Sequence, residues 1–246
     1  MNTAEQLEAQ HPQMAEMIRV QDLHAFYGES HILHGVNFDV KRGELVTLLG
    51  RNGAGRSTTL KSMMNMVGRR TGSIMINGNE TLKMKPHHIP RLGIGYCPEE
   101  RGIFASLDVH ENLLLPPTVR SDGMSLDEIY AMFPNLYERR RSQGTRLSGG
   151  EQQMLAMARI LRTGARILLL DEITEGLAPV IVQKLGEVLV QLKERGMTIV
   201  LVEQNFRFAA PLADRHFVMD HGQIVEEISA AELPSRREHL NSMLGV

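Results

Sequence analysis

Residues 44–64 read ELVTLLGRNGAGRSTTLKSMM, and the rest of the chain is interpreted around this stretch. Its apolar opening has the length of a β-strand and stops at Gly50, a glycine-rich loop follows, and the last residues have the character of a helix. On the phosphate-binding pattern G-x-x-x-x-G-K-[ST], the glycines fall on Gly50 and Gly55 and the hydroxyl on Ser57. Arg56 occupies the lysine position. The stretch therefore predicts a strand, a phosphate-binding loop (P-loop) and a helix, with one element substituted.

The chemistry of the P-loop survives this substitution in large part. Gly53 and Gly55 let successive backbone N–H groups turn inward, and the helix beginning near Ser57 adds its positive N-terminal end, so the loop can hold a polyphosphate. Arg56 keeps the positive charge, but its planar fork is broader than an ammonium group. We expect nucleotide binding to persist, in a weaker or slower form. Because a glycine-rich loop can also be only a turn, later motifs decide between the two.

Length and composition bound the class of protein. The 246 residues fit one large domain, or one domain with a subdomain. A formal net charge of -2 gives no global basic field, so we expect no nucleic acid as the main partner. The single cysteine, Cys97, rules out an internal disulfide framework and fits a reducing compartment. No apolar segment approaches the roughly 18 residues that span a bilayer, and the polar N-terminus lacks a signal core, so we expect a soluble intracellular protein.

The elements before and after the P-loop indicate an α/β domain. Alternating apolar residues predict strands at Ile18–Phe26, Val36–Val40 and Gly72–Asn79, whereas residues 1–16 have no periodicity and are expected to form a loose leader. Between about residues 100 and 162 the patterns become mostly helical, which indicates a helical insertion. Tyr27 falls on a turn after the first strand, where its ring can serve either for packing or for stacking on an adenine.

Two later motifs carry further chemistry. LSGGEQQ, residues 147–153, leads directly into an amphipathic helical pattern with Ser148 as its expected N-cap, which makes a second candidate anion site. RILLLDE, residues 166–172, describes a strand buried on both faces with two acids at its carboxyl end, the end where open α/β sheets gather ligands. Asp171 is suited to hold Mg²⁺ and Glu172 to activate water as a general base. The alternative is a pair of solvated acids that only end a strand.

The remaining chain completes the pattern of a parallel sheet. Residues 198–202, TIVLV, predict another buried strand, which is followed by Glu203, Gln204 and Asn205. HFVMDHGQIVEE predicts a hairpin with its turn at residues 220–222, and a polar helical tail follows.

The P-loop, LSGGEQQ and ILLLDE, in this order and at these separations, resemble the nucleotide-binding subunit of ATP-binding-cassette (ABC) transporters. The resemblance extends from about Ile18 to Val225. It implies an α/β fold, a P-loop NTPase (RecA-like) core with an antiparallel β subdomain and a helical signature-motif subdomain, in a single ABC ATPase domain over residues 17–246. It also implies that two such domains dimerise head to tail, so that each ATP lies between the P-loop of one and the signature loop of the other.

The resemblance assigns site residues, with ATP and Mg²⁺ as cofactors. Tyr27 is placed against the adenine, and a lone protomer holds half of each site. The implied ATP-binding residues are Tyr27, Gly50, Arg51, Asn52, Gly53, Ala54, Gly55, Arg56, Ser57 and Thr58, with Ser148, Gly149, Gly150 and Glu151 acting on the partner's ATP. The implied catalytic residues are Glu172, Gln204 and Arg56, and the implied metal-binding residues are Ser57, Asp171 and Glu99.

Three positions depart from the usual family pattern. Glu99 replaces a glutamine that senses Mg²⁺ and the membrane subunit, Gln204 replaces the switch histidine, and Ala178 replaces an aspartate. The combination of PEERGIF, TEGLAP and LVEQN looks like the ATP-binding subunits of branched-chain amino-acid importers and of their relatives for urea or amides. In such importers a non-identical ATPase often supplies the second half of the site.

The implied function is an ATP-hydrolysing subunit that powers an importer from the cytoplasmic face of the membrane. The implied partners are membrane permease subunits, a second ABC ATPase and, indirectly, a substrate-binding protein. A regulatory subunit with weak or no hydrolysis remains an alternative because of Arg56, Glu99 and Gln204. ABC ATPases of ribosomes or DNA usually carry two cassettes or a long coiled coil, which this chain lacks, and a P-loop kinase has no use for LSGGEQQ.

Overall fold

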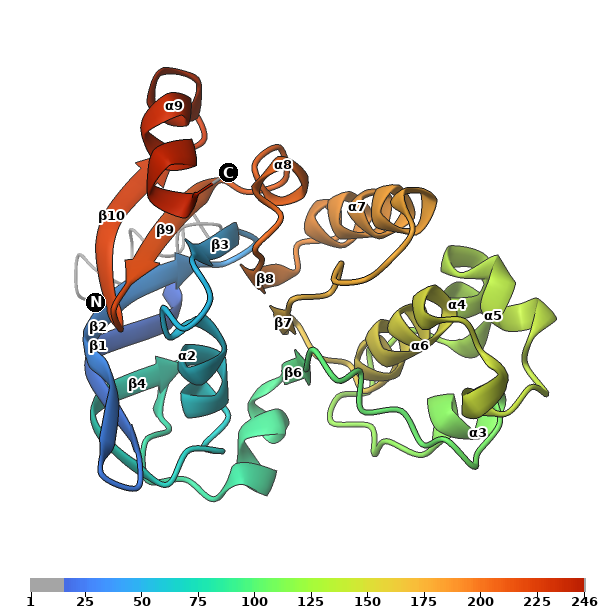
Figure 1. Ribbon diagram of the computed structural model, residues 1–246. Coiled ribbons are helices and arrows are strands. Elements are labelled where there is room, and N and C mark those ends of the chain that lie inside the picture. Colours follow the sequence, from blue (N-terminus) through green and yellow to red (C-terminus); the bar gives the residue numbers. More distant parts are fainter. Residues whose placement is uncertain (1–15, 246) are drawn as a thin grey trace, which may run out of the picture.

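The computed structural model describes residues 16–245 and contains two β-sheets with helices packed around them (Figure 1). The predicted loose leader therefore lies outside the described residues, apart from Glu16. The larger sheet has the strand order β10-β9-β3-β8-β7-β6, and the smaller has the order β2-β1-β4-β5.

The larger sheet is parallel except for its edge strand β10, which pairs antiparallel with β9. Every residue of β3, β7 and β8 is buried, because both faces of the sheet are covered. The strands of this sheet are β3 (Leu45–Gly50), β6 (Ile94–Cys97), β7 (Ile167–Asp171), β8 (Thr198–Val202), β9 (Arg215–Asp220) and β10 (Gln223–Ser229). This sheet confirms the predicted P-loop NTPase core.

The smaller sheet is antiparallel and forms the predicted β subdomain. Its first two strands pair over almost their full length and are longer than their sequence patterns predicted. The strands are β1 (Glu16–Tyr27), β2 (Ser30–Lys41), β4 (Arg69–Ile76) and β5 (Asn79–Glu80). Helix α2 (Arg56–Met63) follows the P-loop, and a 3₁₀ helix, η2 (Pro86–Leu92), precedes β6.

The helical subdomain lies between β6 and β7 in the chain and on the far side of them from α2 in the view of Figure 1. It comprises α3 (Val109–Leu114), α4 (Leu126–Met132), α5 (Pro134–Glu138), η3 (Gly144–Arg146) and α6 (Gly149–Arg162). The helical subdomain of the predicted fold class is thus confirmed, while its boundaries at about residues 100 and 162 stay a prediction. The chain continues with α7 (Pro179–Glu194), α8 (Phe206–Ala209) and α9 (Leu233–Leu244).

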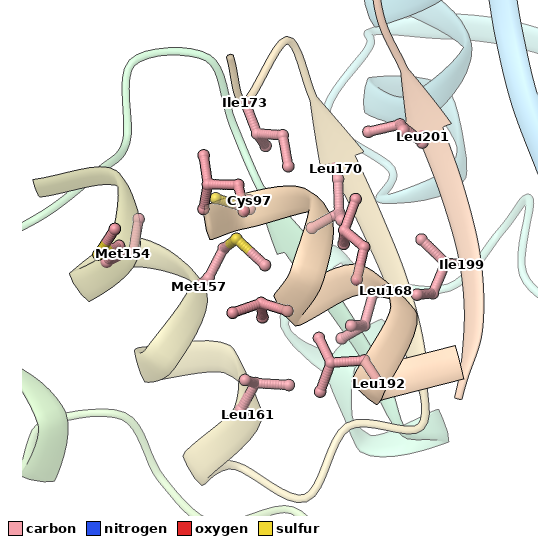
Figure 2. Packing of buried hydrophobic residues seen from close by; sticks show 14 of the residues in the cluster. Cys97, Met154, Met157, Leu161, Leu168, Leu170, Ile173, Leu192, Ile199 and Leu201 are labelled. Atoms are coloured by element: carbon pink, nitrogen blue, oxygen red, sulfur yellow. The ribbon is translucent and has the colours of Figure 1, made fainter. Parts of the chain in front are cut away.

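Alternation along the central strands divides the core between the two faces of the parallel sheet. Leu168 and Leu170 pack with α6 and α7, as Figure 2 shows for a cluster that also holds Met157 and Leu192. Their neighbours Ile167 and Leu169 point the other way, toward α2 and the antiparallel sheet. Because the central strands are packed on both faces, their carboxyl ends are held in fixed positions. The candidate site lies at those ends. Among the described residues, no helix is both long and apolar enough to cross a membrane.

Candidate functional site

The P-loop has the backbone shape that its glycines predict. Gly53 and Gly55 both adopt positive φ angles, 83° and 103°, which are strained for residues with a side chain. A Cβ at Gly55 would also lie 2.7 Å from a methyl carbon of Leu33. The β9–β10 turn supports the loop from outside, since the Gly222 amide donates a hydrogen bond to the Ala54 carbonyl at 2.9 Å. The loop is therefore a preformed cradle.

A cavity of about 400 Å³ lies in front of this cradle. It is lined by Tyr27, by loop and helix residues 52–58, and by Glu99, Glu172 and Glu175. Tyr27 ends β1, is 48% exposed and lines the cavity, so its side chain is accessible to a nucleotide there. Gly50 and Arg51 do not line this cavity but a neighbouring one of about 440 Å³, beside β9 and α9. The structure thus brings together most of the predicted P-loop contacts and Tyr27.

Arg56 forms an ion pair with Glu172, the residue predicted to be the general base. Its Nη2 donates to Glu172 Oε1 at 2.7 Å and to Asn52 Oδ1 at 3.2 Å. Both members of the ion pair are largely withdrawn from solvent, at 4% exposure for Arg56 and 14% for Glu172. The Arg56 Nη1 is buried and has no hydrogen-bond partner within residues 16–245. Because this cationic N–H lies beside the P-loop, a phosphate oxygen of a nucleotide is a suitable acceptor for it.

Asp171 and Ser57 are joined at the end of β7. Ser57 Oγ donates to Asp171 Oδ1 at 2.8 Å, and the Tyr96 hydroxyl donates to Asp171 Oδ2 at 3.0 Å. Burial raises the pKa of Asp171, against the lowering effect of these two hydrogen bonds. A hydroxyl and a carboxylate in contact are hard oxygen donors of the kind that Mg²⁺ prefers, so this pair fits the predicted metal.

Glu99, which the resemblance places at the metal with Ser57 and Asp171, lies among acidic side chains. It lies with Glu172 and Glu175 in a group whose carboxylate oxygens are all within 4.8 Å of one another. The pKa of Glu99 is raised, mainly by desolvation and next by the neighbouring Glu175. The pKa of Glu172 is also raised, chiefly by desolvation, while Arg56 opposes the rise. The three acids repel one another, and a cation bound near them would relieve that repulsion.

Glu203 connects the loop that carries Glu172 with the loop that carries Gln204. Its carboxylate accepts from the Thr174 amide and the Thr174 hydroxyl, both at 3.0 Å. Burial raises the pKa of Glu203 to about 7. Glu172 itself has a positive φ of 47° and donates its amide to Val202 on β8, so its backbone is fixed from the same side. Gln204 is exposed and does not line the cavity of the single chain.

The signature loop, residues 147–153, forms the predicted helix start. Ser148 caps α6 in a capping box, in which its hydroxyl accepts from the Glu151 amide and the Glu151 carboxylate accepts from the Ser148 amide. Gly150 must be small, since a Cβ there would approach Ile181 to 2.8 Å. None of the residues 148–151 lines the cavity at Tyr27. Within one chain, the two predicted halves of the nucleotide site stay apart.

Sequence reasoning missed three residues of the site. Glu175 completes the acidic group, Tyr96 holds Asp171, and Glu203 ties the strand ends together. Of these, only Glu175 had a usable signal, because it is a second acid three positions after Glu172 in the same loop. The other two depend on which strands lie side by side, and β6 and β8 are the neighbours of β7.

The P-loop faces acids at the end of a parallel strand, and a separate helical subdomain carries a glycine-rich helix start. These features together define a nucleotide-binding ATPase cassette. The ABC transporter family profile matches residues 33–175. The chain belongs to the ABC transporter family and is one of its ATPases.

Two relatives cover more than nine tenths of the chain. The high-affinity branched-chain amino acid transport ATP-binding protein BraG of Pseudomonas aeruginosa is 39% identical over 93% of this chain and 100% of its own length. The probable branched-chain amino acid transport ATP-binding protein LivF of Archaeoglobus fulgidus is 34% identical over 94% of this chain and 99% of its own. A solved dimeric structure, described as a post-hydrolysis state of the ATP-binding cassette MJ0796 bound to ADP and Pi, has a TM-score of 0.76 at 24% identity and covers 87% of this chain and 99% of that one. The last likeness supports the fold.

Proposed function

We propose that the chain is the ATP-hydrolysing subunit of a membrane importer for branched-chain amino acids, bound to permease subunits at the cytoplasmic face. The observation that carries the proposal is the 39% identity to BraG over the full length of that relative. The motifs PEERGIF, TEGLAP and LVEQN point to the same importers and to their relatives for urea or amides. The amino-acid substrate is favoured because both relatives described above carry it in their names.

The nucleotide has a defined place in this proposal. Its adenine stacks on the exposed face of Tyr27, and its phosphates take the inward N–H groups of residues 53–58. The buried Arg56 Nη1 gains the acceptor that it lacks among the described residues. Ser57 and Asp171 hold the Mg²⁺ ion, which supplies neutralisation of the charge that develops on the phosphates.

Catalysis requires the ion pair of the resting chain to open. While Glu172 Oε1 accepts from Arg56, the guanidinium compensates the charge of the carboxylate and occupies one of its oxygens. If the phosphates accept from Nη2 as well as from Nη1, they replace Glu172 as the partner of Arg56 and free its carboxylate to orient and deprotonate the attacking water. The pKa of Glu172, raised by desolvation, makes it a stronger base than an exposed carboxylate.

A second cassette completes each site. Ser148 and the glycines that follow it present the N-terminus of the fourteen-residue helix α6, a second preformed anion site. Since these residues lie away from the Tyr27 cavity, they serve the nucleotide of a partner, either a copy of this chain or a non-identical ATPase. Positioning of the phosphate between two such sites is what a loose phosphoryl-transfer transition state needs.

The Arg56–Glu172 pair favours one second candidate, a regulatory subunit that binds ATP and hydrolyses it weakly beside an active partner. A largely buried ion pair costs several kcal/mol to break without replacement contacts. If the phosphates do not replace Glu172 as the partner of Arg56, Glu172 remains in the ion pair and cannot activate water. The rate of the purified chain distinguishes these two candidates.

Uptake by cells tests the proposed function. In the native host, the chain is replaced by Glu172→Gln, and uptake of labelled leucine and labelled urea is compared with that of unaltered cells. The proposal predicts loss of leucine uptake with urea uptake unchanged. Unchanged leucine uptake, or loss of urea uptake alone, would contradict the assigned substrate.

A further inference from the structure

The β1–β2 hairpin gathers three histidines on one face of the antiparallel sheet. His24 is paired with His34, and Phe26 with His31. Residues 31 and 34 would ordinarily face opposite sides of a strand, but register irregularities on either side of the pairs at His24 and Ala25 leave Ile32 and Gly35 without partners. As a result the Phe26 and His31 rings stack at 4.2 Å, and the His31 and His34 rings lie 3.9 Å apart.

Two of these rings face each other through single nitrogen atoms. His24 Nδ1 lies 3.0 Å from His31 Nε2, and His24 Nε2 lies 3.2 Å from Asp22 Oδ1. A carboxylate only accepts hydrogen bonds, so the hydrogen of a neutral His24 ring is on Nε2. The lone pair of Nδ1 therefore points at His31.

The position of Asp22 is built into the hairpin. Its backbone amide donates to Asn37 Oδ1 at 2.9 Å, and Asn37 in turn donates to the Gly35 carbonyl at 2.7 Å. Asp22 has a positive φ of 47°, and a Cβ at Gly35 would lie 3.1 Å from Asp22 Oδ1. The bulged residue Gly35 thus leaves room for the carboxylate beside the His24 ring.

We propose that His24 Nδ1 and His31 Nε2 form a binding site for a divalent transition-metal ion such as Zn²⁺, with Asp22 orienting His24. Imidazole nitrogen is a preferred ligand of Zn²⁺, Cu²⁺ and Ni²⁺, at about 2.0 Å for zinc. A separation of 3.0 Å is short enough for both nitrogens to bind one ion. A metal-binding histidine that donates its other N–H to a carboxylate is the usual arrangement around protein metal ions. Both rings are partly exposed, so water can fill the remaining positions.

The site is separate from the nucleotide cavity. None of Asp22, His24 and His31 lines that cavity, although Phe26, which stacks on His31, is next to Tyr27. Failure of the metal site would therefore leave the proposed ATPase function untouched. The chain offers an internal comparison in His87 and His88, whose rings are 4.3 Å apart edge to face, with no carboxylate hydrogen bond to either ring in the described residues.

Calorimetric titration of the purified, nucleotide-free chain with ZnCl₂ tests the proposal. The native chain should bind one Zn²⁺ ion in a step that His31→Gln and His24→Gln each remove. Asp22→Asn should weaken the same step by about 10- to 100-fold, the usual cost of losing an outer carboxylate partner. The double variant His87→Gln/His88→Gln should bind as the native chain does.

Two outcomes would overturn the site. One is undiminished zinc binding by His31→Gln, and the other is absence of zinc binding by the native chain, which would leave His24 and His31 as a hydrogen-bonded pair only. Far-ultraviolet circular dichroism of each variant confirms that it is folded. A loss of binding in His31→Gln that the double variant at 87 and 88 reproduces would also reject the proposal, since it would reflect general surface binding.

Discussion

The guanidinium of Arg56, at the lysine position of the P-loop, lies 2.7 Å from the carboxylate of Glu172 at the end of β7. The pair joins the residue expected to bind phosphate to the residue expected to activate water. Under the proposed function, hydrolysis requires this contact to open, so the substitution at Arg56 should affect the rate of hydrolysis.

Arg56→Lys should raise the rate of Mg-ATP hydrolysis. A lysine keeps the charge but lacks the planar fork with which Nη2 reaches Glu172 and Asn52 together. We expect an increase of about tenfold, which corresponds to about 1.4 kcal/mol. Arg120→Lys, in an exposed pair with Asp122, is the matched control and should leave the rate unchanged. If Arg56→Lys hydrolyses ATP at or below the native rate, the ion pair does not slow hydrolysis.

Tyr27→Ala should weaken ATP binding, because Tyr27 is the one aromatic residue that lines the cavity in the described part of the chain. Stacking of a base on an aromatic ring contributes about 1 to 3 kcal/mol, and Tyr27→Phe should retain it. A fluorescent ATP analogue measures the affinity. Tyr137→Ala, a similarly exposed tyrosine on α5, serves as the control. If Tyr27→Ala binds as tightly as the native chain, the ring serves for packing alone.

Ser148→Asp should separate the stability of α6 from the function of the signature loop. Aspartate caps helices as well as serine does, so the melting temperature should stay near the native value. Its charge would repel the partner's γ-phosphate and lower ATP-dependent association by about tenfold or more, or about 1.4 kcal/mol. Ser125→Asp, in the capping box of α4, makes the same change without a predicted functional effect. Gel filtration with ATP reads out the association, and equal association of the two variants would exclude Ser148 from the interface.

Glu203 should make the stability of the fold depend on pH. Its pKa is raised from 4.5 to about 7, so the folded chain holds a proton between these pH values that the unfolded chain has lost. Unfolding then releases a proton, and the contribution of Glu203 to stability falls as the pH rises from 4.5 through 7. Relative to Glu203→Gln, the native chain should lose on the order of 3 kcal/mol across this window. Urea unfolding at pH 5 and pH 8 measures the free energy of unfolding of both proteins. If the difference between them is the same at the two pH values, the pKa of Glu203 is not raised.

The sequence predicted those parts of the fold that depend on local pattern. Residues 198–202 form the predicted strand without shift, and β7 ends at Asp171, because apolar runs bounded by acids specify a strand buried on both faces. Ser148 caps its helix as expected, since serine before two glycines and Glu151 satisfies the free amides locally.

What the sequence left open depends on contacts between distant segments. The α7 helix received no assignment, although four of its apolar residues are buried against the sheet. The apolar stretch at residues 89–97 begins in a 3₁₀ helix and becomes a strand only at Ile94, because Gly93 has a positive φ of 84°. The sequence predicts Glu99 at the metal with Ser57 and Asp171, but it does not reveal that Glu99 also lies close to Glu172 and Glu175, since strand order decides which loop ends meet.

Hydrolysis by Glu172→Gln tests the central claim most directly. Glutamine keeps the shape of the side chain but cannot accept the proton of water, so steady-state Mg-ATP hydrolysis should fall by about 100-fold or more. ATP binding should persist, and ATP should hold the variant in a closed dimer with itself or with its partner ATPase. Glu138→Gln, an exposed change on α5, should hydrolyse ATP at the native rate. Undiminished hydrolysis by Glu172→Gln would contradict the account, because the base would then have to be another residue.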